Sequence, residues 1–346
     1  MTKGVDAVTQ AETPAECGFY MPAEWAPHDG CWMMWPCRQE VWSDIEAVKQ
    51  DYVAIAHAIA RFEPVTMAVP PGTVKDARNR LGSDITLAEI PIDDSWARDA
   101  GPCFLVDGKG NRAGVNFTFN AWGETYHPYD SDNAFSEFVL SKTGARQFHS
   151  KLIAEGGGIC VDGEGTLLTT ETCFPNANRN PDWSRDEIEA ELKAMLGVKK
   201  VIWLPGNELE TETNGHIDGI AMFVAPGQVL IEDGDEPGDP WGEIKRANIA
   251  ALDGQTDAQG RSIHMTLIPE ALEAESDSDK FCRSYLNGYI ANGGFIMPRY
   301  GIPADDVARE VFEDVMFGRE IVAVSVDALA TGGGGIHCIT QQVPRA

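Results

Sequence analysis

The chain repeats one pattern of hydrophobic and polar positions. Two short apolar runs are joined by a Gly-containing turn, and an amphipathic segment with a helical period and a further apolar run follow. Strand-forming residues on both sides of such a turn are typical of a β-hairpin. We expect four hairpin turns, at Asp107 to Gly110, Asp162 to Gly165, Ala225 to Gly227 and Asn292 to Gly294. The spacing between them predicts a repeated ββαβ unit.

The segments between the turns support this unit. Helical spacing of apolar residues is found in residues 184–197, 241–254 and 303–318. Each is followed by a strand-like run: KVIWL at 200–204, HMTLI at 264–268 and EIVAVSV at 320–326. The pattern therefore predicts an α/β protein in which every helix leads into a third strand.

A fifth unit can be assembled from the two ends of the chain. We expect residues 336–343 (IHCITQQV) to pair with residues 31–35 (CWMMW), followed by a helix over 44–62 and a strand over 64–69. Pairing of the ends would close five units into a ring, which leaves no exposed sheet edges. No low-complexity linker divides the sequence, so residues 18–346 are interpreted as one domain and residues 1–17 as a frayed extension.

Composition narrows the function classes. The 346 residues include 27 basic and 54 acidic side chains, a formal net charge of −27, which argues against a nucleic-acid partner. The sequence has no apolar run suited to a signal peptide or a membrane span, so we expect a cytoplasmic protein with no membrane partner. Its eight cysteines contain no CxxC pair, which disfavours a zinc ribbon or a thioredoxin-type motif.

Unusual polar residues stand at one place in the repeat, just before or at the start of a unit's first strand. Equivalent positions of a ring converge near its axis, so these residues form a candidate catalytic site: Asp94, Glu155, His216, Asp218 and Cys338. The tetraglycine Gly332 to Gly335 would let a substrate approach the backbone closely. His337 is adjacent to Cys338, but neighbouring side chains on a strand point to opposite faces, so His216 is the preferred base.

The chemistry of this set favours a cationic substrate. Carboxylates around a thiol raise its pKa, whereas a bound cation favours the thiolate. A guanidinium is planar and permanently charged and forms bidentate pairs with carboxylates. Asp94 and Asp218 could therefore clamp its nitrogens and place its carbon over Cys338.

Six stretches of the chain resemble those of agmatine deiminases, the agmatine iminohydrolases of the peptidylarginine-deiminase-like, guanidino-modifying superfamily. They lie between Met21 and Gln342 and read MPAEWAPHDGCWMMWPCR, DDSWARDAGP, EGGGICVDGEGTLLTTE, NRNP, ETNGHIDG and GGGGIHCITQQ. The resemblance implies the pentein fold, a five-bladed α/β propeller. It also implies hydrolysis of agmatine to N-carbamoylputrescine and ammonia, a step of arginine catabolism and putrescine (polyamine) biosynthesis, with no metal or organic cofactor.

The resemblance also implies the role of each site residue. Cys338 would be the nucleophile that forms a covalent thiouronium, His216 the general acid and base, and Asp94 and Asp218 the guanidinium ligands. Glu155 would orient the histidine or the substrate. Two departures concern the substrate: residues 123–133 (GETYHPYDSDN) are shorter than the Gly-rich loop of the family, and Gly335 stands where the family often has Asn.

Further residues are assigned to the pocket or to packing. Trp96 and Trp122 are expected to cover the substrate, Gly335 to approach it, and Glu212 to bind the distal amine, although Glu212 could equally be an exposed loop residue. Three other tryptophans are expected mainly to pack: Trp25, Trp32 and Trp35. Arg98 and Asp99 are expected to form a supporting ion pair.

Three alternatives remain open. The chain could deiminate free or peptide arginine, whose carboxylate would require an Arg or Lys in the pocket. It could bind a guanidine or polyamine without catalysis, or it could be a His/Asp/Cys metal enzyme that chelators inactivate. A homo-oligomer is compatible with each of them.

Overall fold

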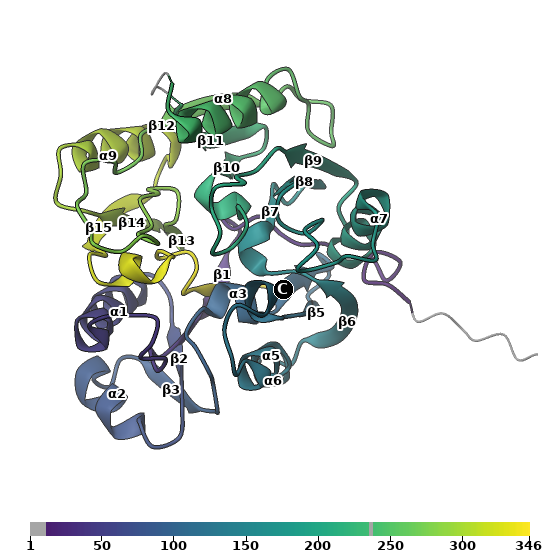
Figure 1. Ribbon diagram of the computed structural model, residues 1–346. Coiled ribbons are helices and arrows are strands. Elements are labelled where there is room, and N and C mark those ends of the chain that lie inside the picture. The colour runs from purple at the N-terminus through teal and green to yellow at the C-terminus, as the bar shows by residue number, and fades with distance from the viewer. Residues whose placement is uncertain (1–11, 235–237) are drawn as a thin grey trace, which may run out of the picture.

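The computed structural model describes residues 12–234 and 238–346 (Figure 1). Within these residues the strands form five sheets, and no helix is both long and apolar enough to cross a membrane. Every described sheet contains an antiparallel strand pair continued by a parallel strand, and a helix connects the two parallel strands. The predicted α/β class and the ββαβ unit are confirmed.

The sheets occupy separate sectors of the molecule in Figure 1. Four of them follow chain order, and their strands are β4 (Cys103–Val106), β5 (Arg112–Thr118) and β6 (Arg146–Ile153); β7 (Cys160–Val161), β8 (Thr166–Thr170) and β9 (Lys200–Leu204); β10 (Ala221–Ala225), β11 (Gln228–Glu232) and β12 (His264–Ile268); β13 (Tyr289–Ala291), β14 (Gly294–Arg299) and β15 (Glu320–Ser325). The antiparallel pairs within them confirm the four predicted hairpins.

The fifth sheet joins the two ends of the chain. Its strand order is β16 (Gln341–Pro344), β1 (His28–Met34), β2 (Val65–Val69) and β3 (Thr86–Glu89). Cys31 pairs with Gln342 and Trp32 with Gln341, so the predicted pairing of the end segments is confirmed. The strand begins later than expected, because residues 336–339, including Cys338, form a turn before β16.

Helices cover the sheets through their apolar faces. The longer ones are α1 (Ile45–Ala60), α2 (Val74–Leu81), α6 (Phe135–Thr143), α7 (Arg185–Leu196), α8 (Pro240–Leu252) and α9 (Ala304–Val315). In α1, Val48, Tyr52, Ile55 and Ile59 recur at helical spacing and are fully buried. Burying each such side chain contributes about 1.5–3 kcal/mol. The Asp44 carboxylate caps the first turn of α1 by accepting from the backbone N–H groups of residues 46 and 47.

Short helical turns lie between the strands. They are α3 (Ala97–Ala100), α4 (Ala121–Glu124), α5 (Asp130–Asn133), and the 3₁₀ turns η1 (Gly156–Gly158), η2 (Ile217–Gly219) and η3 (Leu329–Gly332). Three of them, α3, η1 and η2, stand immediately before β4, β7 and β10, the first strands of three hairpins.

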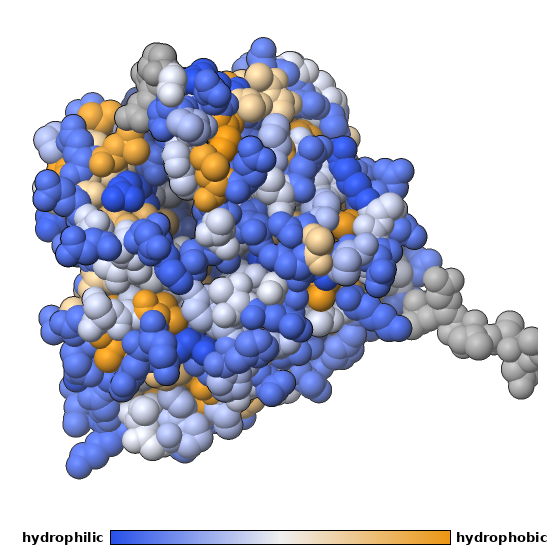
Figure 2. Space-filling view, viewed as in Figure 1, coloured by the Kyte–Doolittle hydropathy of each residue, from blue (hydrophilic) through white to orange (hydrophobic). Residues whose placement is uncertain are grey.

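The face of the molecule seen in Figure 2 is mainly hydrophilic, and the described part of the N-terminal segment contacts α7. Hydrophilic side chains predominate on the face shown in Figure 2, and the hydrophobic ones lie there in small separate groups. Residues 1–11 of the predicted extension lie outside the described residues. Within residues 12–17, the backbone N–H of Ala15 donates to the carbonyl of Ala194 in α7 (3.1 Å).

Candidate active site

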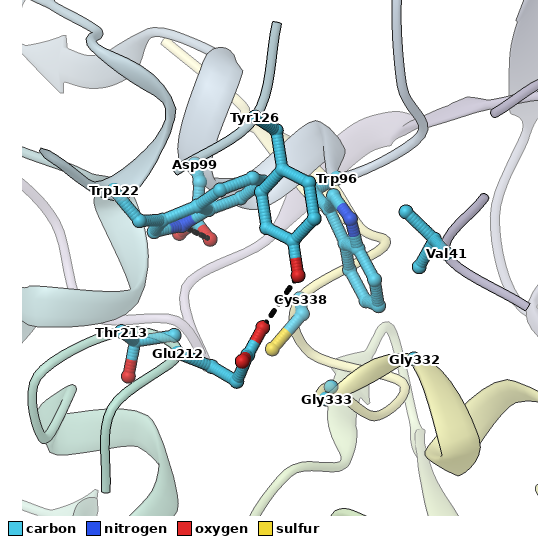
Figure 3. A pocket seen from close by; sticks show the side chains of 11 residues that line it. Val41, Trp96, Asp99, Trp122, Tyr126, Glu212, Thr213, Gly332, Gly333 and Cys338 are labelled. Carbon is cyan, nitrogen blue, oxygen red and sulfur yellow. Dashed lines mark hydrogen bonds between the residues drawn. The ribbon is translucent and has the colours of Figure 1, made fainter. Parts of the chain in front are cut away.

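Cys338 lies at the meeting point of two depressions. The smaller is a pocket with an empty volume of about 340 Å³, and Figure 3 shows its lining. It is lined by Val41, Trp96, Asp99, Trp122, Tyr126, Glu212, Thr213, Gly332, Gly333, Gly334 and Cys338. The larger is an open cleft that also reaches Cys338 and Glu212, and whose wall includes His216, Asp218 and Asn287.

The Cys338 thiol is buried among polar partners. The Asn287 side-chain amide donates to the sulfur (3.2 Å), and Asp218 Oδ2 lies 3.5 Å from it. Burial, followed by the charges of Asp218 and Asp99, raises the pKa of Cys338 well above its usual value. The thiol is therefore protonated when no cation is present.

His216 stands at the start of η2 between two carboxylates. Its Nε2 is 3.5 Å from Glu155 Oε2 and its Nδ1 is 3.8 Å from Asp99 Oδ1. Burial lowers the pKa of His216, but the acidic groups of Asp99, Cys173 and Glu155 outweigh burial and raise the pKa well above the usual histidine value. The imidazole is therefore protonated near neutral pH and can deliver a proton.

Gly157 marks the point where these groups meet. Its backbone N–H donates to Asp99 Oδ1 (2.9 Å). A Cβ added at this glycine would lie 2.4 Å from His216 Nδ1, 2.9 Å from Asp99 Oδ1 and 3.0 Å from Asp218 Oδ2. The segments that carry these residues can converge only because position 157 has no side chain.

The structure places Asp99 in the pocket, and Asp94 outside both depressions. The Asp94 carboxylate faces Arg38 Nε (3.1 Å), and burial together with the charge of Asp132 raises the pKa of Asp94 to about 7. Asp99 Oδ2 instead accepts a hydrogen bond from the Trp122 indole (3.0 Å). The turn α3 contains Asp99 and directs its carboxylate into the pocket, whereas Asp94 precedes this turn and faces Arg38.

Arg98 also differs from the expectation. The structure shows an ion pair from its guanidinium to Glu24 (3.4 Å), not to Asp99, and its backbone N–H donates to the Cys338 carbonyl (3.0 Å). Adjacent residues of the short helix α3 face different ways, so Arg98 and Asp99 serve different neighbours.

His337 contacts the site, which the expectation of a strand had excluded. Because residues 336–339 form a turn, its ring lies beside Asp218, with Nδ1 2.8 Å from Asp218 Oδ2. Its Nε2 lies 2.8 Å from Glu24 Oε1. Asp218 therefore pairs with His337.

Arg179 and Asn287 are site residues that sequence reasoning missed. Arg179 Nε donates to Glu155 Oε1 (2.7 Å) with both side chains fully buried, and its Nη1 reaches the Asn214 side chain (2.6 Å). It lies within NRNP, a motif that had received no role. Asn287 comes just before β13, the place in the fourth unit that matches Cys338 in the fifth, and this position could have identified it.

Aromatic rings form the walls of the pocket. The Trp96 and Trp122 rings meet edge to face, with centroids 6.4 Å apart. Trp122 adopts a left-handed backbone (φ 54°, ψ 45°), as do Ala121 and Glu124 around it. Such strain is maintained by the surrounding structure and here turns the indole into the pocket. Both tryptophans lie where the sequence predicted, whereas Trp32 and Trp35 are buried in the core and Trp25 packs against it.

Glu212 lies in the pocket wall and is not simply an exposed loop residue. The Tyr126 hydroxyl donates to Glu212 Oε2 (2.6 Å), as drawn in Figure 3, and Lys280 Nζ lies 3.0 Å from the same oxygen. Gly335 packs against Asn287, where an added Cβ would lie 2.7 Å from Oδ1. The pocket wall itself contains Gly332 to Gly334.

One group of side chains could in principle hold a metal ion. Among the described residues, ligand atoms of Glu155, Cys173 and His216 lie within 4.8 Å of one another. The Arg179 guanidinium already forms an ion pair with the Glu155 carboxylate, and its positive charge opposes the binding of a metal cation there. This group contains Cys173 and not Cys338, so it is not the His/Asp/Cys metal site considered from the sequence.

The family model for Porphyromonas-type peptidyl-arginine deiminases matches residues 20–344. The chain belongs to this family. It is 41% identical to a putative agmatine deiminase of Legionella pneumophila subsp. pneumophila, over 96% of this chain and 97% of that protein. An agmatine deiminase of Pseudomonas fluorescens is 42% identical over 97% and 98% of the two chains. The Porphyromonas-type peptidyl-arginine deiminase family thus accounts for almost the whole sequence.

A solved structure of the same kind matches the fold. The agmatine deiminase of Enterococcus faecalis, described as catalysing its reaction, superimposes with a TM-score of 0.93 at 34% identity. The match covers 97% of this chain and 98% of that one. The chain therefore shares the fold of this solved structure as well as much of its sequence.

Proposed function

We propose that this chain hydrolyses agmatine to N-carbamoylputrescine and ammonia. One observation carries the proposal: a buried thiol lies where an aromatic-walled pocket meets a cleft, with Asp99 in the pocket wall and with Asp218 and a histidine held between acids in the cleft wall. The relatives named agmatine deiminase, at 41% and 42% identity over nearly the full chain, support the same substrate.

Binding of the guanidinium starts the reaction. Asp99 and Asp218, in place of the predicted pair Asp94 and Asp218, accept hydrogen bonds from the guanidinium nitrogens. Such charge-assisted bonds contribute about 1.5–3 kcal/mol each. The bound cation also lowers the cost of ionising Cys338, whose thiol is otherwise kept protonated by burial and by acids.

The covalent steps use Cys338 and His216. With the cation bound, the Cys338 thiol loses its proton to solvent, and the thiolate adds to the guanidinium carbon. The tetrahedral adduct then expels ammonia as the C–N bond breaks and His216 donates a proton to the leaving nitrogen. Neutral His216 then removes a proton from water, which attacks the S-alkylthiouronium carbon. Collapse breaks the C–S bond and releases N-carbamoylputrescine and the thiol. General acid–base catalysis of this kind contributes about 10²- to 10⁴-fold.

Glu155 and Arg179 position the histidine. Glu155 lies 3.5 Å from His216 Nε2, and the Arg179 guanidinium holds Glu155 ionised. Burial opposes this charge, but Arg179 and His216 lower the pKa of Glu155 to about 2. The glutamate thus stabilises the imidazolium that donates the proton.

The other end of the pocket favours agmatine over arginine. Among the described residues that line the small pocket there is an acid, Glu212, and no Arg or Lys. Lys280, in the wall of the adjoining cleft, pairs with Glu212. The acid suits the distal ammonium of agmatine, whereas the carboxylate of arginine would meet Glu212 as a like charge.

The repeat further supports a closed arrangement. The five described sheets share one ββαβ plan and β16 pairs with β1, so we extend the proposal to a five-bladed α/β propeller that forms one domain over residues 18–346. Cytoplasmic location and homo-oligomer formation stay predictions from the sequence.

The deciding experiment compares ammonia release from agmatine and from L-arginine under identical conditions. We expect agmatine to be turned over with a kcat/KM at least about 100-fold higher, because a lost charge pair costs roughly 3 kcal/mol. Cys338→Ala is the matched control and should still bind agmatine without releasing ammonia. Preferred turnover of arginine would refute the substrate, and turnover by Cys338→Ala would refute the covalent route.

A further inference from the structure

Glu24 and His337, which have no role in the proposed reaction, form a bridge to Asp218, one of the two proposed guanidinium ligands. The His337 ring lies between the two carboxylates, 2.8 Å from Asp218 Oδ2 through Nδ1 and 2.8 Å from Glu24 Oε1 through Nε2. Glu24 belongs to the N-terminal stretch MPAEW. The bridge thus links the first motif of the chain to the residue that precedes the thiol.

The hydrogen bonds of the bridge require a charged imidazole. An ionised carboxylate only accepts, so each ring nitrogen must carry a proton to donate to its partner. Arg98 is a charged group beside the bridge, with Nη1 3.4 Å from Glu24 Oε1. Burial and Arg98 lower the pKa of His337, but Glu24 and Asp218 outweigh them and raise it above the usual value.

The remaining neighbours of the bridge act on its two carboxylates. His28 Nε2 lies 2.9 Å from the Glu24 carbonyl, and its charge, when present, stabilises ionised Glu24. His216 and Arg98 stabilise ionised Asp218 in the same way. Although burial opposes the charge, His337 and Arg98 lower the pKa of Glu24 to about 2, so Glu24 is ionised at every pH of interest.

The bridge ends beside the sulfur. Asp218 Oδ2, the oxygen that meets His337, is also the one 3.5 Å from Cys338 Sγ. A positive ring at this place offsets the charge of Asp218 next to the thiol and fixes the rotation of the carboxylate, which leaves Oδ1 for the substrate.

We propose that Glu24 and His337 are positioning residues, in which Glu24 keeps His337 protonated and protonated His337 holds Asp218 toward the guanidinium and favours the Cys338 thiolate. The inference rests on the proposed deiminase function. Without the charge of Glu24, His337 should lose its proton at a lower pH. The rate of the reaction should then depend on the protonation of His337, which the intact bridge keeps complete.

The test is the pH dependence of agmatine turnover by Glu24→Gln. The amide keeps the shape of the side chain and the backbone carbonyl that meets His28, but His337 loses one of its two carboxylates. We expect kcat/KM relative to wild type to be about tenfold lower at pH 8 and to recover to within about threefold at pH 6, where His337 regains its proton. A ratio that is the same at both pH values would overturn the proposal.

Two further variants separate charge from structure. Glu63→Gln is the matched control, because Glu63 is a buried carboxylate paired with another histidine, His28, at 3.2 Å. It should lower the melting temperature and leave the pH profile unchanged.

His337→Asn keeps a donor near Asp218 without a charge and should lose activity at both pH values, with no recovery at pH 6. If Glu24→Gln fails to fold, His337→Asn tests the proposal alone. Agmatine turnover by His337→Asn within threefold of wild type would then overturn the proposal.

A measurement independent of turnover completes the test. ¹⁵N NMR of labelled histidine, assigned through His337→Asn, reports the protonation of the ring directly. We expect both nitrogens of His337 to stay protonated up to pH 8 in wild type and to lose a proton at lower pH in Glu24→Gln. If His337 is neutral at pH 7 in the wild-type protein, the proposal is overturned even when the enzyme is active. Absence of agmatine turnover by wild type, with a charged His337, would instead refute the function.

Discussion

At the scale of single residues, the site is a set of opposed charges packed around one thiol. Acids surround Cys338 and His216. Burial and these acids raise the pKa of Cys338 well above its usual value, and the acids also raise the pKa of His216, although burial lowers it. Without a bound cation, Cys338 is therefore a poor nucleophile, and His216 carries the proton that it is proposed to donate. A cation placed between Asp99 and Asp218 offsets their charges and favours the Cys338 thiolate, which is the first change that the proposed reaction needs.

The choice between Asp99 and Asp94 can be tested by a pair of matched variants. Asp99→Asn removes a pocket charge, and we expect kcat/KM for agmatine to fall about 10- to 100-fold, because a charged hydrogen bond contributes roughly 1.5–3 kcal/mol. Asp94→Asn should stay within about threefold of wild type, since Asp94 faces Arg38. Steady-state kinetics on both proteins would check this, and the reverse order would restore Asp94 as the guanidinium ligand.

At the scale of elements, the site is built by the segments that enter the hairpins. Asp99 precedes β4, Gly157 precedes β7, His216 and Asp218 precede β10, Asn287 precedes β13, and Cys338 precedes β16. Each described sheet thus contributes through the same part of its unit. Tight turns at these places, rather than continued strands, decide which side chain faces the neighbouring units.

Close approach of these turns predicts a steric effect at Gly157. In Gly157→Ala the new Cβ would stand 2.4 Å from His216 Nδ1, so His216 or Asp99 must move. We expect a loss of more than about 100-fold in kcat/KM, because small misplacements of catalytic groups cost this much. Gly219→Ala is the matched control next to Asp218, since its added Cβ meets nothing within 4 Å. Equal activity of the two variants would show that the close packing at Gly157 has no role in catalysis.

At the scale of the whole molecule, the catalytic cysteine depends on the joining of the chain ends. Cys338 lies in the turn before β16, and β16 is held by its pairing with β1. The four residues of β16 are buried. Loss of this strand would free the turn and expose the edge of β1.

A C-terminal truncation tests this dependence. Deletion of residues 341–346 should lower the melting temperature by about 5–10 °C and abolish agmatine turnover, because a buried strand is lost beside the nucleophile. Deletion of residues 345–346 alone, which are exposed, should leave both nearly unchanged. Calorimetry and ammonia release measure the two effects, and an active protein without β16 would contradict this account.

The sequence by itself determined the repeat. Turn chemistry, apolar periodicity and the absence of linkers predicted the hairpins, the helices and the pairing of the chain ends, because these depend on local propensity and on burial. The same position in each unit identified Glu155, His216, Asp218 and Cys338, which the structure brings together. These predictions depend on spacing alone and do not require knowledge of side-chain direction.

Only the tertiary structure decided which of two neighbouring side chains faces the site. Asp99 rather than Asp94 enters the pocket, and His337 rather than being turned away holds Asp218, because α3 and the turn at 336–339 replace extended backbone. Arg179 pairs with Glu155, and Glu24 pairs with His337, so both contacts join segments that are separate in the sequence. Direction and long-range pairing follow from packing between units, which no local pattern records.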